Sequence, residues 1–279
     1  MGIAFGLAAA LAWGTSDFLG GRFATRFPTF TVGLASQSTS FLLLCIVLAF
    51  VRPEIEGPML AWGLAAGLFT SFGGLALYQG LATGDSAVVA PLSACGAVVP
   101  VVFAFATGDA PGGLQTAGIA VAFAGIILTS LPRDGVNFAS SHHLRPVLFG
   151  LGAAVGFGLF FVLIDKGGSS DEESLVVLAA ARFGGTVFVA AVGTVARGIT
   201  WPGRELPRLA GVGAIDVSAN AAFALATNRG NVAVASVLSS LYPLQTLVLS
   251  RLFTTEQFTR LRVLGAGLAL AGVGLISAG

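Results

Sequence analysis

The segment GIAVAFAGIIL at residues 118–128 recurs 147 residues later as GAGLALAGVGL at residues 265–275. Both copies are apolar on every side and lack the strict alternation of a barrel strand, so we expect helices. Each copy carries two glycines seven residues apart, which fall on one helix face and permit close helix contact. These glycines are Gly118 and Gly125 in the first copy and Gly265 and Gly272 in the second.

Other segments repeat in the same order along the chain. FGLAAALAWG (5–14) aligns with FGLGAAVGFG (149–158) at a shift of 144 residues. A shift of 146 residues aligns Gly84-Asp85 with Gly230-Asn231 and Leu92-Ser93 with Leu238-Ser239. The small differences between the shifts fall at loops, where insertions are tolerated. The chain is therefore predicted to contain two copies of one structural unit.

The composition indicates that lipid is the natural solvent of this chain. Hydrophobic residues make up 55% of the 279 positions and charged residues only 10%, whereas about a quarter of a soluble domain is charged. The net charge of +1 does not indicate a nucleic-acid partner. The two cysteines, Cys45 and Cys95, fall within apolar runs, so we expect small core residues rather than a disulfide or a metal site.

Ten apolar stretches of about 20 residues are predicted to cross the membrane as helices. They are residues 2–21, 29–51, 58–81, 86–107, 113–131, 147–165, 174–196, 208–228, 231–250 and 262–278. The longest connection separates two expected domains, a first five-helix repeat at 1–132 and a second at 146–279. The predicted fold class is an all-α membrane protein of ten transmembrane helices, with no connection long enough for an extramembrane domain.

Each repeat has an odd number of spans, so the second repeat must enter the membrane from the opposite side. Inverted repeats are typical of secondary transporters that work by alternating access, with the substrate site near the bilayer midplane between the repeats. Most of the 14 basic residues fall at connections on the side opposite the two termini. The positive-inside rule then predicts that both termini lie outside.

Three ionisable residues stand out within the predicted spans, where charges are costly and usually functional. Asp17 lies one turn after Trp13, Arg182 is the only charge in its span, and Asp216 lies one turn before Asn220. One interpretation is a polar cavity in which Arg182 holds a carboxylate and an aspartate binds an amine or a proton. The other is an internal salt bridge from Arg182 to Asp216 or Asp17 that only locks the bundle. Trp13 would either stack on an aromatic substrate or fill the seam between helices.

Uncharged candidates share helix faces. Ser71 and Tyr78 lie two turns apart on one face of the third span. In the ninth span the candidates are Ser239, Tyr242 and Pro243. Because Pro243 cannot donate to the carbonyl of Ser239, a kink is predicted there. Broken helices at the midplane are a common transporter device, although proline also bends membrane helices for purely structural reasons.

The motifs WGTSDFLGG (13–21) and SSLYPLQTLVLSRLFTTEQ (239–257), the latter followed by a glycine-spaced last span, resemble those of the EamA family of the drug/metabolite transporter superfamily. The acidic residue of the second motif is Glu256. A weaker copy in the first half, PLSACGAVVPVVFAFATGD (91–109), has its proline displaced and Asp109 in place of Glu. The resemblance implies ten helices, no prosthetic cofactor, a ninth span that lines the cavity, and export or exchange of small metabolites such as amino acids.

Two rival classes are an intramembrane enzyme and a channel. The enzyme needs a nucleophile–base pair or a metal cluster at membrane depth, but the only histidines, His142 and His143, fall in the central connection. A channel needs rings of charge or carbonyl groups, which no pattern suggests. The expected partners are a small-molecule substrate and membrane lipid, with no nucleic acid and no metal. We expect a monomer or homodimer in the plasma (inner) membrane of a prokaryote.

Overall fold

The computed structural model describes residues 1–82, 89, 92–130, 144–253 and 260–279, and the regular secondary structure of this part of the chain is entirely helical. The first half contains α1 (Gly2–Ala24), α2 (Thr29–Val51), α3 (Gly57–Ala82), η1 (Cys95–Ala97), α5 (Val98–Thr107) and α6 (Gly113–Ser130). The second half contains α7 (Leu144–Gly167), α8 (Asp171–Val195), η3 (Gly203–Glu205), α9 (Leu206–Thr227), α10 (Val232–Ser239), α11 (Tyr242–Phe253) and α12 (Arg260–Ala278). Within the described residues, six helices are long and apolar enough to cross a membrane, and four shorter apolar helices complete the ten predicted spans.

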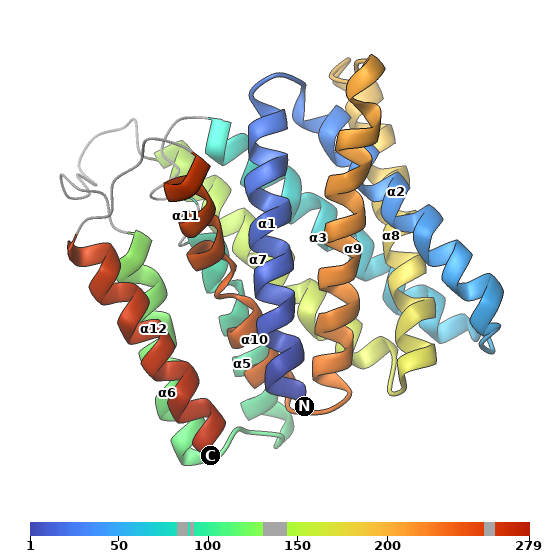
Figure 1. Ribbon diagram of the computed structural model, residues 1–279. Coiled ribbons are helices and arrows are strands. Elements are labelled where there is room, and N and C mark those ends of the chain that lie inside the picture. Colours follow the sequence, from blue (N-terminus) through green and yellow to red (C-terminus); the bar gives the residue numbers. More distant parts are fainter. Residues whose placement is uncertain (83–88, 90–91, 131–143, 254–259) are drawn as a thin grey trace.

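The two halves run in opposite directions, as the odd number of spans predicts. α1 starts at the end of the bundle that carries the N-terminus, whereas its repeat partner α7 runs toward that end, and α6 and α12 are antiparallel (Figure 1). Both termini lie at this end, called the terminal end below (Figure 1). The inverted five-helix repeat is therefore confirmed. Gly84, Asp85, His142, His143 and Glu256 lie outside the described residues.

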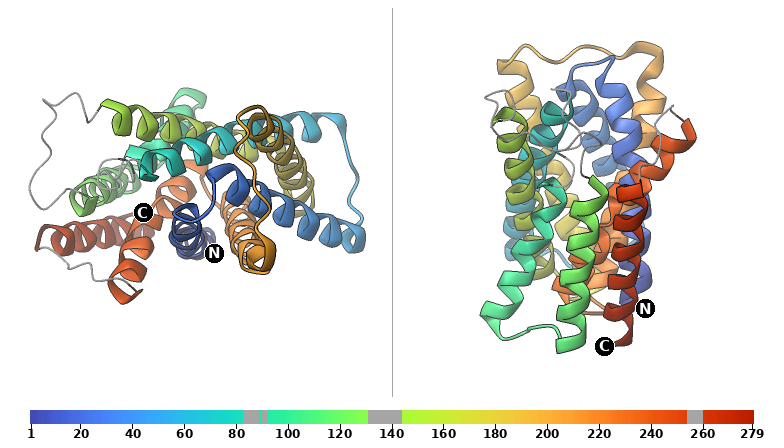
Figure 2. Two further views of the ribbon diagram at one scale, coloured as in Figure 1. Left: turned by 90° about the horizontal axis from the view of Figure 1, so that it is seen from above. Right: turned by 90° about the vertical axis from the view of Figure 1, so that its left-hand side faces the viewer.

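The halves interlock rather than pack as separate bodies. α3 packs against α7 and α8 of the other half, and α1 packs against α9 in the symmetry-related contact. α2 lies against α8 and α9, and α6 pairs with α12. Seen from above, α3 runs beside α7 on one side of the molecule and α1 beside α9 on the other (Figure 2). One apolar core accordingly joins buried residues of both halves, among them Ala66, Phe160 and Phe223.

Glycines let the helix backbones of the two halves touch, as their spacing predicts. A Cβ atom on Gly272 of α12 would lie 2.5 Å from the backbone nitrogen of Ala122 and 2.7 Å from the carbonyl oxygen of Gly118 on α6. Gly67 of α3 lies equally close to the backbone of Ala181 on α8. Side chains at these positions would push the helices apart, so the small residues determine the interhelical distance.

The ninth span is broken at the place that Pro243 predicts. α10 ends at Ser239 and α11 begins at Tyr242, because proline has no N–H to continue the helical hydrogen bonds. The equivalent span of the first half carries the 3₁₀ turn η1, which the 146-residue shift aligns with residues 241–243. The first-half proline, Pro100, lies further along, inside α5. The break is therefore a property of the repeated fold and not of the proline alone.

Candidate functional site

A cavity lies between the α3–α7 side and the α1–α9 side of the molecule. Residues of α1, α2, α3, α7, α8, α9 and α11 form its walls, so both halves contribute. Its polar lining residues are Ser16, Asp17, Ser36, Gln37, Thr70, Ser71, Tyr78, Arg182, Asp216, Asn220 and Tyr242. Arg182 and Asp216 sit near the middle of α8 and α9. Most of the other lining residues lie between that level and the end opposite the termini, so the cavity extends from mid-depth toward that end.

Eight of the ten site residues predicted from the sequence line this cavity: Trp13, Asp17, Ser71, Tyr78, Arg182, Asp216, Asn220 and Tyr242. Ser239 and Pro243 are not part of the lining. The Ser239 hydroxyl donates to the carbonyl of Gly6 on α1 at 3.3 Å, and Pro243 is buried just after the break between α10 and α11. These two residues hold the broken span in place, because they face the neighbouring helix and the core instead of the cavity.

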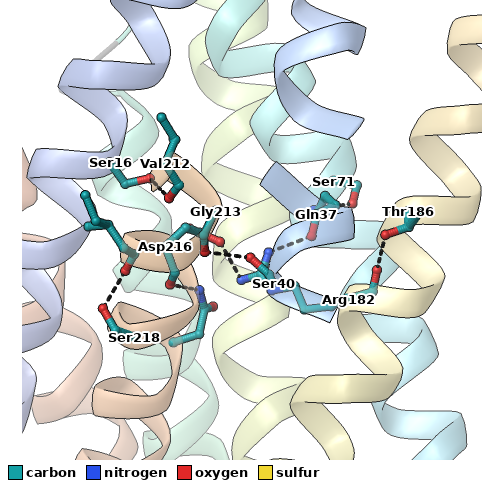
Figure 3. Close-up of polar contacts among 12 residues, drawn as sticks. Ser16, Gln37, Ser40, Ser71, Arg182, Thr186, Val212, Gly213, Asp216 and Ser218 are labelled. Atoms are coloured by element: carbon teal, nitrogen blue, oxygen red, sulfur yellow. Dashed lines mark hydrogen bonds and ion pairs between the residues drawn. The ribbon is translucent and has the colours of Figure 1, made fainter. Parts of the chain in front are cut away.

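Arg182 of α8 lies at the centre of a polar chain that crosses four helices (Figure 3). Its guanidinium lies 3.0 Å from the Asp216 carboxylate on α9 and donates to Oε1 of Gln37 on α2 at 2.7 Å. Gln37 in turn donates to the Ser71 hydroxyl on α3 at 2.9 Å. The Arg182 side chain is only 4% exposed, and burial of a guanidinium is tolerated when a carboxylate neutralises it and acceptors take up its donors. The salt bridge considered from the sequence is therefore formed with Asp216.

Contacts between α2 and α9 place the Asp216 carboxylate opposite Arg182. Ser40 on α2 donates to the carbonyl of Gly213 at 2.8 Å (Figure 3). A Cβ on Gly213 would collide with the backbone of Ser36, so the two helices touch at this level. Asn220, one turn beyond Asp216, donates to its main-chain carbonyl at 2.6 Å and leaves the carboxylate free for the guanidinium.

Trp13 and Asp17 lie one turn apart on α1, and both face the cavity. The Trp13 ring packs 5.8 Å, centroid to centroid, from both Phe161 and Phe223. Phe223 is fully buried, so this aromatic cluster closes the cavity toward the terminal end. Asp17 is half-buried and makes no hydrogen bond or ion pair with any residue that the structure describes. Trp13 thus fills the helix seam and forms part of the wall, beside a carboxylate that has no partner in the described chain.

An ion pair reinforces the closed terminal end. Arg229, between α9 and α10, donates to both carboxylate oxygens of Asp171 at 2.8 and 2.5 Å, and its guanidinium lies 5.4 Å from the ring of Phe5. The hydrogen bonds that Arg229 donates to the Asp171 carboxylate raise the pKa of Arg229 above its ordinary value. Asp171 is the first residue of α8, whose N-terminus is capped by the Ser170 hydroxyl. The pair ties α1, α8 and the α9–α10 connection together.

The sequence reasoning missed several polar residues of the cavity lining, of which Gln37 makes the most consequential contacts. Its amide bridges Arg182 and Ser71 in the buried interior. A signal was present, because Gln37 is the only amide in the long apolar run at 29–51, and a buried amide there needs partners. Ser36 also lines the cavity, but serine is an ordinary packing residue between membrane helices, so no pattern marked it.

The fold and the cavity define a class of protein, namely a membrane transporter made of two inverted helical repeats around a central polar cavity. The model of the EamA-like transporter family matches residues 1–131 and 144–278, so the chain belongs to that family, whose members are transporters and not enzymes. A solved structure described only as "Crystal structure of protein" is similar to this chain, with a TM-score of 0.80 and 16% sequence identity, covering 99% of this chain and 96% of its own. That likeness supports the fold alone. No curated protein sequence matches the chain.

Proposed function

We propose that this protein is a secondary transporter that carries a small organic metabolite, such as an amino acid, by alternating access. The observation that supports this function is the polar chain from Ser71 through Arg182 to Asp216, which lies at mid-depth and is built by helices of both halves. In an inverted repeat, exchange of the conformations of the two halves makes such a site accessible from the other end. Export or exchange is the direction that the family resemblance implies.

The closed terminal end supports a carrier over a channel. Between the cavity and that end stand the aromatic cluster around Phe223 and the Arg229–Asp171 ion pair. A channel conducts through a pore that is open at both ends at once. A molecule in this cavity can leave toward the terminal end only after these contacts separate. The transport cycle therefore includes a conformational change between the two access states.

The test is counterflow in proteoliposomes. Purified protein is first screened against a panel of L-amino acids by thermal shift, and the best ligand is then used in radiolabelled form. We expect saturable uptake that an internal load of unlabelled ligand accelerates. Asp216→Ala should abolish it, whereas Leu42→Ala, on the lipid-facing side with 62% exposure, should leave it unchanged. Flux that grows linearly with concentration and ignores the internal load would support a channel instead.

A further inference from the structure

Among the residues that the structure describes, the cavity lining contains one more carboxylate than its cations neutralise. The ionisable side chains that line it at mid-depth are Asp17, Arg182 and Asp216, together with the phenols of Tyr78 and Tyr242. Arg182 and Asp216 form an ion pair at 3.0 Å and cancel one another. Asp17 makes no hydrogen bond or ion pair with any described residue, and its charge repels that of Asp216 across the cavity. The unpaired Asp17 therefore makes the cavity attractive to a cation.

Arg182 is poorly placed to receive an anion. Two of its nitrogens are already taken by Gln37 and Asp216. The third, Nε, has no hydrogen-bond partner among the described residues, but it is buried and inaccessible from the cavity. The Arg182 side chain is only 4% exposed and its guanidinium already faces the Asp216 carboxylate at 3.0 Å, so a substrate carboxylate would have to compete with Asp216 for it. An incoming negative charge would also face the carboxylates of Asp17 and Asp216.

Aromatic rings line the same cavity as Asp17. Trp13 lies one turn before it on the same face of α1. Tyr78 of α3, Phe157 and Phe161 of α7, and Tyr242 of α11 line the same cavity. The faces of aromatic rings attract ammonium and guanidinium groups, most strongly where water is excluded. A carboxylate flanked by such rings suits a protonated amine that carries an apolar or aromatic body.

We propose that Asp17 is the cation subsite of this cavity and that the preferred substrate is a small organic amine with a net positive charge. This inference rests on the proposed function and narrows it, because it ranks amines above the zwitterionic amino acids. An amine neutralises Asp17 and leaves the Arg182–Asp216 pair intact. A zwitterion brings a carboxylate for which the described cavity lining offers no cation besides Arg182, which Asp216 already neutralises.

Three ligands with the same aromatic body test the ranking. Phenethylamine is a cation, L-phenylalanine a zwitterion and 3-phenylpropionate an anion at neutral pH. Binding to the purified full-length protein is measured by isothermal titration. We expect phenethylamine to bind at least about tenfold more tightly than phenylalanine, and phenylpropionate to bind least, because a charge-assisted hydrogen bond is equivalent to about 10- to 100-fold in affinity.

Variants assign the preference to one side chain. Asp17→Asn should weaken phenethylamine binding about 10- to 100-fold and remove its advantage over phenylalanine. Asp17→Glu should retain the advantage. Asp165→Asn is the matched control, since Asp165 lies beside Lys166 near the end of α7 and outside the cavity lining, and it should leave all three affinities within about twofold of wild type.

The outcomes separate this inference from the proposed function. If wild-type protein binds phenylalanine as well as or better than phenethylamine, or binds none of the three ligands, the cation subsite is wrong whatever the variants do. An unchanged preference in Asp17→Asn also overturns it. Saturable counterflow of an amino acid would in each case leave the carrier function standing. Loss of counterflow for every ligand, despite tight phenethylamine binding, would overturn the carrier function and keep the subsite.

Discussion

The charges of the Arg182–Asp216 pair can be removed singly or together. We expect removal of one charge to destabilise the protein much more than removal of both. At 3.0 Å and an effective dielectric constant of about 20, the gross Coulomb attraction is about 5.5 kcal/mol. Asp216→Asn removes the charge but keeps an acceptor, and the carboxylate it replaces is 19% exposed. We therefore expect a loss of stability of about 2–3 kcal/mol, below the range for removing one partner of a fully buried pair. The double variant Arg182→Met/Asp216→Asn leaves no uncompensated charge and should lose at most about 1 kcal/mol.

Thermal unfolding in detergent measures the first half of this prediction. At about 2–4 °C per kcal/mol for a chain of this size, Asp216→Asn should melt about 4–12 °C below wild type, and the double variant should recover most of that difference. An unchanged melting temperature in Asp216→Asn would refute the reasoning about the buried charge. Counterflow measures the second half. We expect the double variant to be folded and inactive, and wild-type transport by it would mean that the pair only locks the bundle.

Four further predictions follow from the structure. Gly272→Ala forces a Cβ against α6, whereas the neighbouring Gly274→Ala meets open space, so only the first should lower the melting temperature, by an amount equivalent to about 1–3 kcal/mol; equal effects would contradict the packing. Asp171→Asn breaks the ion pair with Arg229, so hydrogen exchange at residues 228–231 should rise, and no rise would contradict the role of this pair in closing the terminal end. If protons drive transport through Asp17 or Asp216, protonation removes the carboxylate charge and the pH profile should flatten in Asp17→Asn or Asp216→Asn; unchanged profiles in both variants would exclude such coupling. A reporter fused to the C-terminus should be active only outside the cell, since the positive-inside rule predicts that the end opposite the termini, which carries most of the basic residues, faces the cytoplasm; a cytoplasmic signal would contradict this predicted orientation.

Features that depend on periodicity were predictable from the sequence. The seven-residue spacing of Gly118 and Gly125 correctly predicts a close helix contact. The odd number of spans predicts the inversion, and Pro243 predicts the broken ninth span. Each of these follows from local rules that hold whatever the neighbouring helix is. The membrane spans, and the helix faces that consist of small residues, can therefore be predicted before any tertiary contact is known.

Pairings between helices were not predictable in the same way. Arg182 had two possible carboxylate partners, and the choice depends on the height at which α9 touches α2, where Gly213 meets Ser36. That height is a long-range property of the packed halves. The direction of Ser239 also depends on its neighbour, because its hydroxyl donates to Gly6 on α1. Local helix-face reasoning placed Ser239 in the cavity because it could not include this contact.

The interlocked packing also bears on which parts move during transport. α3 is held by α7 and α8, and α1 by α9 and the broken span α10–α11, so each sequence repeat is divided between two groups of helices. The cavity lies between these groups. Ser71 and Arg182 belong to the α3–α7–α8 group, and Asp17 and Asp216 belong to the α1–α9 group. Rocking of one whole repeat against the other would break the closest contacts between the repeats, such as the contact of Gly67 on α3 with α8. Movement between the mixed groups would preserve those contacts and change the Arg182–Asp216 distance, so the ion pair would lie at the boundary that opens and closes in the proposed alternating access.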